Sequence, residues 1–229
     1  MAVNVSVVMA AYNGEKYIRE QLDSILSQLE ENDEVIISDD GSSDATVDII
    51  HEYQRHYSVI KLIRGPRRGY VFNFENGIKN ASNDVILLAD QDDIWENNKI
   101  IFLKQYFSEN PDIEVINHSG FIFNNEGVSV IPKGFSKFNG KYFGCCMALR
   151  RSYAKKLLPF PSWTPTHDQL IAFTSILRRS FVFLDDIPLM RHRIHESNLT
   201  RRGSIIKAVV FRIKIYSAVA ICFARMLFK

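Results

Sequence analysis

The feature that most constrains the fold is the alternation of short apolar runs with helical patterns through the first half of the chain. Apolar runs that predict strands cover residues 5–10, 34–38, 59–63 and 85–89. Segments with apolar residues at helical spacing follow them, at 15–28, 44–57, 73–81 and 97–107. Ser42 or Ser43 is the expected cap of the second helix. Four strand–helix units in a row predict an α/β fold, with a Rossmann-like, mostly parallel sheet flanked by helices.

The pattern loosens beyond residue 113. The segments EVINHSGFIF (114–123) and FGCCMAL (143–149) have strand character, and NNEG (124–127) is the predicted turn between these hairpin arms. A further helix is predicted over 168–179 and a strand over 181–184. No linker or repeat interrupts the chain, and 229 residues suit one globular domain with a full core.

Composition excludes several classes of protein. The net charge of +2 argues against a dedicated nucleic-acid binder. Cys145, Cys146 and Cys222 are too few and too badly spaced for a disulfide framework or a zinc site, and they fit a reducing cytosol. The N-terminus has no basic region before its first apolar run, so we do not expect a signal peptide.

Polar residues follow three of the predicted strands. The first strand ends in AAYNG (10–14), the second in SDDGSSD (38–44) and the fourth in ADQDD (89–93). Ligands of open parallel sheets bind beyond the carboxyl ends of the strands. The three strand ends are therefore expected to converge on one binding site.

The SDDGSSD segment allows two interpretations. It suits a tight turn with a helix cap, but a cap needs only one oxygen, and two adjacent aspartates exceed that need. A carboxylate at the sheet edge can accept a hydrogen bond from the imide N–H of a nucleobase. Tyr12, after the first strand, could lie flat against such a base or belong to the core.

The ADQDD segment groups three carboxylates that repel one another. A solvated acidic loop is the plain interpretation. Hard oxygen ligands grouped at a strand end also suit Mg²⁺ or Mn²⁺, which bind substrate phosphates as well. A nucleotide diphosphate would complete such a site, and the metal would stabilise the leaving diphosphate as negative charge develops on it.

These motifs, in this order, resemble a known family. SVVMAAYNG, SDDGSSDAT and LLADQDDIW resemble the nucleotide-binding half of family 2 inverting glycosyltransferases, which have the GT-A fold. Downstream, GCCMALRR (144–151) resembles their acceptor-site segment, and THDQLIA (166–172) resembles the element that carries the catalytic base. HRIHESN (192–198) resembles the R-x-H-x-x-N element of bacterial rhamnosyltransferase-like members. The likeness covers roughly residues 3 to 200.

The resemblance assigns roles to particular residues. Asp40 would bind the base with Asp39 nearby, Asp92 is the preferred metal ligand, and Asp168 would be the catalytic base. The expected donor nucleotide-binding residues are Ala10, Tyr12, Asn13, Glu15, Asp39, Asp40, Asp90, Gln91 and Arg193. The expected ligands of Mn²⁺ or Mg²⁺ are Asp92, Asp90, Asp93 and His195.

Alternatives accompany several of these roles. Asp168 could instead cap the helix that follows it. Many relatives have Glu-Asp where this chain has His167 and Asp168, and some have Trp where Gln169 stands, which leaves the acceptor open. Arg67 and Arg68 could approach the donor or form a solvated turn, and Arg201 and Arg202 could contact the diphosphate or lipid headgroups.

The segment 203–229 is predicted to form a basic, amphipathic C-terminal helix. Lys207, Lys214, Arg225 and Lys229 fall on one side of a helical wheel, Arg212 departs from this stripe, and no acid follows Glu196. We expect this helix to rest on an anionic membrane surface. The alternative is a helix packed on the catalytic domain or on a second subunit. Residues 1–202 would then form one GT-A domain, with a nucleotide-binding half (1–110) and an acceptor half (111–202).

Taken together, the sequence predicts a metal-dependent inverting glycosyltransferase of bacterial polysaccharide assembly. Its donor would be a nucleotide diphosphate sugar, with deoxythymidine-diphosphate rhamnose favoured and a UDP-hexose as the alternative. Its acceptor would be a lipid-linked or growing cell-surface saccharide, and it would lie in the cytoplasm at the inner face of the cell membrane. A sugar nucleotidyltransferase is disfavoured because AAYNGEKY lacks a glycine-rich phosphate loop. The intact DQDD and Asp168 disfavour a non-catalytic binding subunit.

Overall fold

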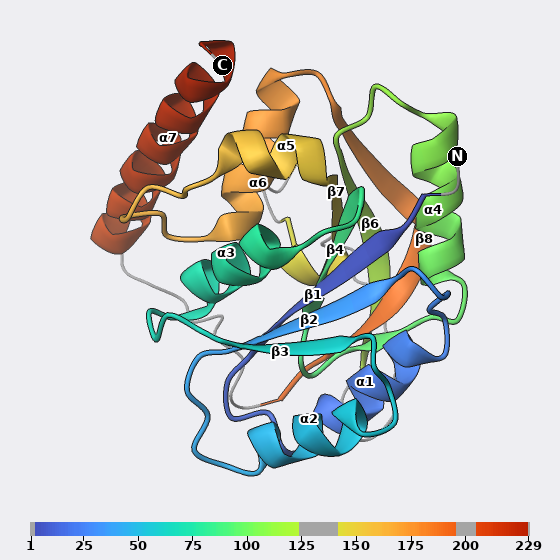
Figure 1. Ribbon diagram of the computed structural model, residues 1–229. Coiled ribbons are helices and arrows are strands. Elements are labelled where there is room, and N and C mark those ends of the chain that lie inside the picture. Colours follow the sequence, from blue (N-terminus) through green and yellow to red (C-terminus); the bar gives the residue numbers. More distant parts are fainter. Residues whose placement is uncertain (1–2, 124–141, 196–204, 229) are drawn as a thin grey trace.

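The computed structural model describes residues 3–123, 142–195 and 205–228 (Figure 1). The strands are β1 (Val5–Ala11), β2 (Glu34–Asp39), β3 (Ile60–Arg64), β4 (Val85–Asp90), β5 (Ile94–Trp95), β6 (Val115–Phe123), β7 (Met147–Arg150) and β8 (Phe181–Arg193). The helices are α1 (Ile18–Leu26), α2 (Thr46–Gln54), α3 (Tyr70–Asn80), α4 (Lys99–Glu109), α5 (Arg151–Leu157), α6 (His167–Leu177) and α7 (Ile205–Leu227).

The strands form one eight-stranded sheet in the order β3-β2-β1-β4-β7-β6-β8-β5. The neighbours from β3 to β4 are all parallel, as four successive strand–helix units require. Beyond β4 the sheet is mixed, because β7 runs antiparallel to both β4 and β6, while β8 runs parallel to β6. The predicted α/β fold is therefore confirmed, with its parallel part confined to the first half of the chain and to the β6–β8 pair.

Helices cover both faces of the sheet (Figure 1). Val7 belongs to a core cluster with the inner sides of α1, α2 and α4, and its neighbour Val8 belongs to a second cluster with α3, α5, α6 and α7. Successive residues of a strand point to opposite faces, so burial on both faces requires apolar residues at every position. This explains why β1, β2 and β4 are continuous apolar runs and not alternating ones.

The predicted elements of the first half are present with shifted ends, but the predicted cap of α2 is wrong. Ala45 precedes the first residue of α2, and no side chain caps that helix. The Ser42 hydroxyl instead donates to Asp39, while Asp44 Oδ1 accepts the backbone N–H of Thr46 at 3.0 Å. The polar turn before α2 is thus tied to the end of β2 through Ser42 and to the first residue of the helix through Asp44.

The second half departs further from the predictions. β6 and β7 pair antiparallel as hairpin arms should, and the expected turn at 124–127 lies outside the described residues. The predicted strand at 143–149 begins instead as a 3₁₀ turn, Gly144–Cys146. β8 runs on to Arg193, well past residue 184, because irregularities in its pairing with β6 let it continue along that strand. The helix α5 was not predicted.

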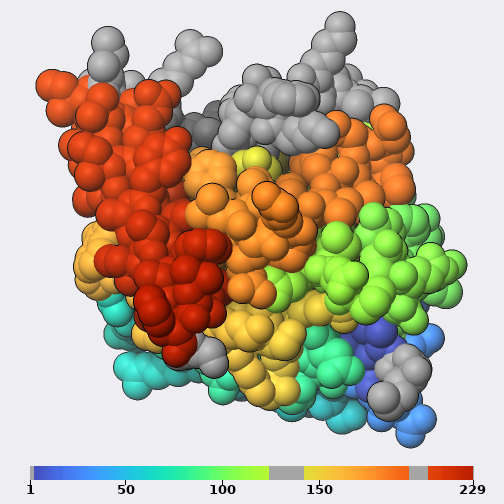
Figure 2. Space-filling view, turned by 90° about the horizontal axis from the view of Figure 1, so that it is seen from above, coloured from blue at the N-terminus to red at the C-terminus, as the bar shows by residue number. Residues whose placement is uncertain are grey.

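The C-terminal helix α7 packs on the domain along one side. Ile215, Ala218, Val219, Cys222 and Met226 are buried in the second core cluster, and Figure 2 shows the helix as a ridge along one flank of the molecule. Within residues 3–123, 142–195 and 205–228, the helices lack the length and apolar character that a membrane crossing requires. The predicted domain boundary at residues 202 and 203 falls outside the described residues and stays a prediction.

Candidate active site

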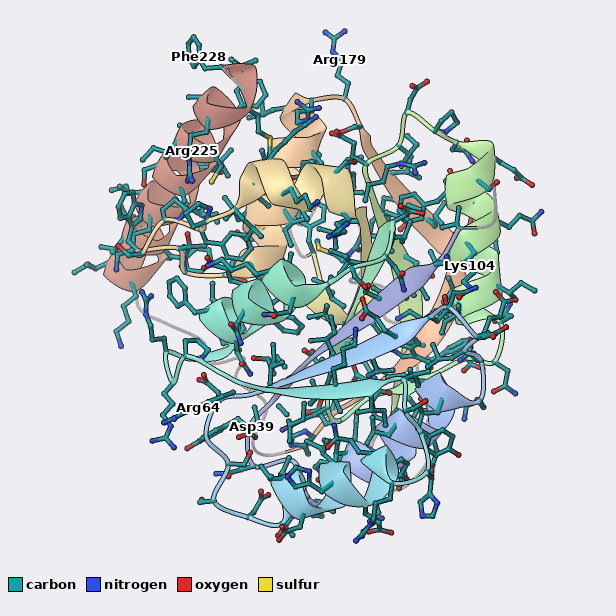
Figure 3. All side chains as sticks on the ribbon, viewed as in Figure 1. Asp39, Arg64, Lys104, Arg179, Arg225 and Phe228 are labelled. Carbon is teal, nitrogen blue, oxygen red and sulfur yellow. The ribbon has the colours of Figure 1, made fainter. Side chains whose placement is uncertain are left out.

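The strand register brings the polar strand ends together at one edge of the sheet. Ala10 is paired with Ser38 on β2 and with Asp90 on β4. Asp39, at the end of β2, is paired with Ala11 on one side and with Arg64 on the other. Asp39 and Arg64 lie together at this edge, away from Lys104 on α4 (Figure 3). The residues after β1, β2 and β4 therefore border one site.

Two side chains of the loop after β1 bind the turn that follows β2. Asn13 accepts the backbone N–H of Ser43 at its Oδ1 across 2.8 Å, and its own N–H donates to Ser42 Oγ at 2.9 Å. Glu15 accepts the backbone N–H of Ala45 across 2.9 Å. Both residues were expected to line the nucleotide pocket. In the structure their hydrogen bonds hold the loop after β1 against the loop after β2.

Gln91 links the loop after β1 to the acidic loop after β4. Its side-chain amide pairs with both backbone groups of Tyr12, accepting the N–H and donating to the carbonyl, each at 2.9 Å. A Cβ on Gly14 would lie 2.2 Å from Gln91 Oε1, so only glycine leaves room for this pairing. The Tyr12 ring is 57% exposed, which excludes the core alternative and leaves its face open to a ligand.

Asp39 and Asp40 both order backbone around the site. Asp39 Oδ2 accepts two successive backbone N–H groups of the following turn, each at 3.0 Å. Asp40 accepts the N–H of Arg67 at 2.6 Å and that of Gly69 at 2.8 Å, which ties the loop after β3 to the site. A carboxylate has about four lone-pair positions, so each side chain retains capacity to accept an N–H of a base.

Three acidic side chains meet at the end of β4 and are called the carboxylate cluster: Asp90, Asp92 and Asp93. Each offers an oxygen, and the three oxygens lie within 4.8 Å of one another. Burial and the charges of Asp93 and Asp92 raise the pKa of Asp90 to about 8. Burial and the charge of Asp93 also raise the pKa of Asp92. Grouping these carboxylates therefore costs free energy, which a cation between them would offset.

The end of β8 closes over the carboxylate cluster. His192 Nδ1 lies 2.8 Å from Asp93 Oδ1, which also accepts the backbone N–H of Arg193 at 3.1 Å. Burial lowers the pKa of His192, but the hydrogen bond and the charge of Asp93 outweigh it and raise the pKa to about 9. His195 Nε2 lies 2.7 Å from Asp92 Oδ2. The imidazolium of His192 thus offsets part of the negative charge.

Arg193 was expected to contact the diphosphate, and its surroundings are mostly protein. The side chain is 7% exposed, its Nε donates to the Asp92 carbonyl at 3.0 Å, and its guanidinium forms an ion pair with Glu20 on α1. It also lies over the rings of Tyr17 and Phe123, at 5.0 and 4.5 Å from their centroids. Arg193 therefore holds β8, α1 and the acidic loop together, and its contact with a donor stays a prediction.

The carboxylate cluster fits a divalent metal ion. Its ligand atoms are hard carboxylate oxygens, which suit Mg²⁺ or Mn²⁺. Asp93 Oδ2 is buried and has no hydrogen-bond partner among the described residues, although its other oxygen has two. Such an orphaned oxygen is costly unless something else binds it. Asp90, Asp92 and Oδ2 of Asp93 are the groups that would hold the ion.

Asp168 lies in the first turn of α6. Its Oδ1 accepts the Thr166 hydroxyl and the backbone N–H of Gln169, whereas Oδ2 accepts no hydrogen bond from the described residues. Thr166, not Asp168, precedes the first helical residue, so the cap alternative is wrong. Burial raises the pKa of Asp168 to about 6 although those hydrogen bonds act to lower it. Its charge also contributes to the raised pKa of Asp90.

Sequence patterns missed two buried side chains beside these carboxylates. Lys99, at the start of α4, is fully buried, donates to the Cys145 carbonyl at 3.0 Å and lies 3.9 Å from the Trp95 ring centroid. His167 stacks on Phe74 with 4.2 Å between ring centroids, and burial lowers its pKa to about 3. Neither burial is predictable locally, because Cys145 and Phe74 come from distant parts of the chain.

Some expected site residues cannot be placed. Residues 196–204, which include the end of the HRIHESN element, Arg201 and Arg202, lie outside the described residues. Arg67 and Arg68 are exposed in the loop after β3, where Arg68 packs over the ring of Phe72 at 3.9 Å, so their contact with a donor stays a prediction. The thiols of Cys145 and Cys146 are buried, and hydrogen bonding between them, with burial, raises the pKa of Cys145. Buried thiols with a raised pKa suit small wall residues and not nucleophiles.

The comparison with protein families agrees with this geometry. The model described as glycosyl transferase family 2 matches residues 6–158, more than half of the chain. The chain belongs to glycosyl transferase family 2. The family expected from the sequence motifs is thereby confirmed. The matched range includes the loops after β1, β2 and β4, whereas Asp168 and the β8 histidines lie beyond it.

Individual members of glycosyl transferase family 2 and solved structures show the same likeness. The chain is 29% identical over 220 residues to the dTDP-rhamnosyl transferase RfbG of Shigella flexneri, covering 83% of this chain and 72% of RfbG. It matches S. aureus TarS 1-349 in complex with UDP-GlcNAc at a TM-score of 0.76 and 21% identity, covering 98% of this chain and 71% of that one. It also matches the mannosyltransferase PcManGT from Pyrobaculum calidifontis, in complex with GDP-Man and Mn²⁺, at a TM-score of 0.70 and 16% identity, covering 100% and 65%.

These likenesses establish the GT-A fold of this family 2 member. The chain spans only part of several curated relatives, for example 39% of one and 63% of another. The activity, substrates and partners of those longer proteins therefore bear on this chain only as proposals.

Proposed function

We propose that this member of glycosyl transferase family 2 is a metal-dependent inverting glycosyltransferase. It would move a sugar from a nucleotide diphosphate donor to a hydroxyl of a glycan acceptor. The observation that carries the proposal is the meeting of the Asp39–Asp40 pair and the carboxylate cluster at one sheet edge. A base-binding group, a phosphate-end metal site and a proton acceptor are the three parts that such a transfer needs.

The reaction is a single displacement. The acceptor hydroxyl oxygen bonds to the anomeric carbon, the bond from that carbon to the diphosphate oxygen breaks, and the nucleoside diphosphate leaves. Asp168 takes the hydroxyl proton through Oδ2, since Oδ1 is occupied by Thr166 and Gln169. When bound, Mn²⁺ or Mg²⁺ supplies positive charge that stabilises the leaving diphosphate. Tyr12 and Asp40 hold the base at the other end of the donor.

The donor sugar is proposed as rhamnose, with a UDP-hexose as the alternative. The support for rhamnose is the likeness to the protein named dTDP-rhamnosyl transferase, RfbG, over 72% of that protein's length. TarS, solved with UDP-GlcNAc, and PcManGT, solved with GDP-Man, are only 21% and 16% identical to the chain, so they support the fold alone. The acceptor is proposed as a lipid-linked or growing cell-surface polysaccharide.

Titration of the purified protein with a panel of nucleotide diphosphate sugars, with and without Mn²⁺, tests the proposal. The panel contains dTDP-rhamnose, UDP-glucose, UDP-galactose, UDP-N-acetylglucosamine and GDP-mannose. Metal-dependent binding of one donor, with slow release of its sugar to water, is the expected result. Binding of none, or equal binding with and without the metal, contradicts the proposal.

The α7 helix supports a peripheral position at the inner face of the cell membrane. Its first turns expose apolar side chains, with Ile206 at 76%, Ile213 at 64% and Tyr216 at 59%. The charged residues of α7 are all basic, and Lys207 and Lys214 are exposed between those apolar residues. Apolar and basic side chains interleaved on one helix suit an anionic lipid surface. The residues of α7 that pack on the domain, between Ile215 and Met226, lie on the opposite side of the helix. The helix can therefore pack on the domain and bind a membrane at the same time.

Flotation with vesicles that contain phosphatidylglycerol tests the membrane position. Ile206→Glu and Ile213→Glu are expected to reduce the bound fraction several-fold. Ile101→Glu on α4, at a side chain that is 65% exposed, is the matched control and should bind as the wild type does. Equal flotation of all four proteins, or none by the wild type, contradicts the membrane position and leaves the transferase proposal unaffected.

A further inference from the structure

Tyr70 is an exposed aromatic residue at the centre of the candidate site, and neither folding nor the roles proposed above account for its exposure. It is the first residue of α3 and is 40% exposed. The preceding residue, Gly69, donates its backbone N–H to Asp40 Oδ2 at 2.8 Å. One side of Tyr70 is thereby fixed to the carboxylate proposed to bind the base.

The other side of Tyr70 reaches the helix that carries the proposed catalytic base. Its hydroxyl donates to the carbonyl of Pro165 at 3.2 Å, and its ring meets the ring of His167 edge-on, with 5.8 Å between centroids. Burial raises the pKa of the Tyr70 phenol, and the charges of Asp168 and Asp90 raise it further. The ring thus lies beside the first turn of α6, which carries Asp168, and next to the loop that Asp40 binds.

We propose that Tyr70 binds a pyranose ring at the reacting centre, by packing its exposed face against the C–H face of the sugar. This inference rests on the proposed function and adds the residue that holds the sugar itself. A transferred sugar must lie between the diphosphate, held at the carboxylate cluster, and the hydroxyl that Asp168 deprotonates. The ring of Tyr70 contacts His167, the residue before Asp168, and Tyr70 follows the glycine that donates to Asp40. Its hydroxyl is fixed, so the aromatic face is oriented before the ligand arrives.

The chemistry of the two surfaces is complementary. A pyranose presents axial C–H groups on one face and hydroxyls at its rim, and an aromatic ring offers a flat apolar surface of similar size. Asp168, which follows the His167 that the ring contacts, can accept a hydrogen bond from a rim hydroxyl. A 6-deoxyhexose has one hydroxyl fewer and gains more from this contact.

A purely structural role for Tyr70 predicts a different pattern of effects. If its task were only to tie α3 to the segment before α6, the hydroxyl contact with Pro165 would matter most. Tyr70→Phe would then be as harmful as Tyr70→Ala. If the ring binds sugar, Tyr70→Phe retains binding and Tyr70→Ala loses it.

Calorimetric titration separates the sugar contribution from the nucleotide contribution. The probes are dTDP and UDP, and then dTDP-rhamnose and UDP-N-acetylglucosamine, each with Mn²⁺. Tyr70→Ala is expected to raise the Kd of the bound nucleotide sugar about 5- to 10-fold, the scale of one aromatic contact, and to leave the Kd of the nucleoside diphosphate within twofold. Tyr57→Ala, at another tyrosine that is 43% exposed, is the matched control and should change neither.

A second arm distinguishes the donor sugar from the acceptor sugar. Methyl glycosides of rhamnose, glucose and N-acetylglucosamine are added to enzyme saturated with nucleoside diphosphate and Mn²⁺, and saturation-transfer NMR reports their binding. A loss by Tyr70→Ala in the first arm assigns the ring to the donor sugar, and a loss only in the second assigns it to the acceptor sugar. No loss in either arm, or equal losses for Tyr70→Phe and Tyr70→Ala, overturns the inference. Failure of the wild type to bind any nucleotide overturns the proposed function and the inference with it.

Discussion

His192 Nδ1 lies 2.8 Å from Asp93 Oδ1, which joins the end of β8 to the acidic loop after β4 across 99 positions of sequence. Asp93 is fully buried, and the raised pKa of His192, about 9, makes this a charged pair at neutral pH. The two neighbouring carboxylates have different surroundings. Asp92 and Asp90 are partly exposed. Asp93 is buried, and its Oδ1 accepts hydrogen bonds that hold the end of β8 in place.

This difference predicts that Asp92→Asn and Asp93→Asn fail in different ways. Asp92→Asn removes the proposed metal ligand, so Mn²⁺-dependent nucleotide binding should weaken by at least about 10-fold, with little change in Tm. Asp93→Asn breaks a buried charged pair and should cost about 3–5 kcal/mol of unfolding free energy. Calorimetry and thermal unfolding measure the two effects, with Asp112→Asn at an exposed acid as the control. Equal stability losses in both variants would contradict this division of roles.

Protonation of Asp168 should determine how kcat/KM for transfer falls at acidic pH. Its pKa of about 6 lies above that of a free aspartate, so the group is protonated, and lost as a base, at a higher pH than usual. We expect kcat/KM for transfer to fall as pH drops below about 6. Asp168→Asn should lower transfer by about 10²- to 10⁴-fold and remove this fall, with donor Kd near that of the wild type. Normal transfer by Asp168→Asn would show that another group is the base.

Gly14 should be intolerant of any side chain because of Gln91. Gly14→Ala places a Cβ 2.2 Å from Gln91 Oε1, so the amide must release both backbone groups of Tyr12. We expect a loss of about 1–3 kcal/mol in unfolding free energy and weaker nucleotide binding. A double-mutant cycle with Gln91→Ala isolates the clash, because the second substitution creates space for the alanine. Additive losses in the double variant would mean that Gly14 matters for another reason.

Glu34, at the start of β2, should make the unfolding free energy depend on pH in the acidic range. Burial raises its pKa, but hydrogen bonds from Lys61, Ser6 and Ser82 outweigh that and lower it to about 2, against 4.5 for a free group. Between these values the unfolded chain binds more protons than the folded one, so unfolding free energy falls as pH drops from about 4.5 to about 2. Glu34→Gln should flatten this fall, by about 1–3 kcal/mol in chemical denaturation. Glu31→Gln, at an exposed acid, should keep the wild-type slope.

The sequence predicted the strands that border the site, because strand patterns are local features of the sequence. The apolar runs before residues 11, 39 and 90 are buried strands, and parallel pairing places their ends side by side. The polar residues after them were therefore expected together from periodicity alone. The family resemblance supplied the rest of the expected roles, which the structure does not test.

The misses share a physical cause: in each case the folded chain selects a partner that no local sequence rule ranks first. Ser42 has the chemistry of a helix cap, yet Asp39 binds its hydroxyl three positions away, and no local rule ranks these partners. Lys99 reads as a surface lysine on α4 until the Cys145 carbonyl and the Trp95 ring bury it. The sequence does not predict that the ring of Tyr70 is held in place, because its contacts with Pro165 and His167 form only in the folded chain.

The long sequence separation between the carboxylate cluster and β8 has a consequence for synthesis on the ribosome. The strands β1 to β4 can pair with one another as soon as the first 110 residues emerge, because the β3–β2, β2–β1 and β1–β4 pairings lie within that stretch. A nascent chain at that stage carries the complete acidic motif without His192, Arg193 or His195. Only after β8 is made do Asp92 and Asp93 gain their partners. Donor binding should therefore switch on late in translation, and fragments that keep the acidic motif but lack β8 should not compete for nucleotide sugars.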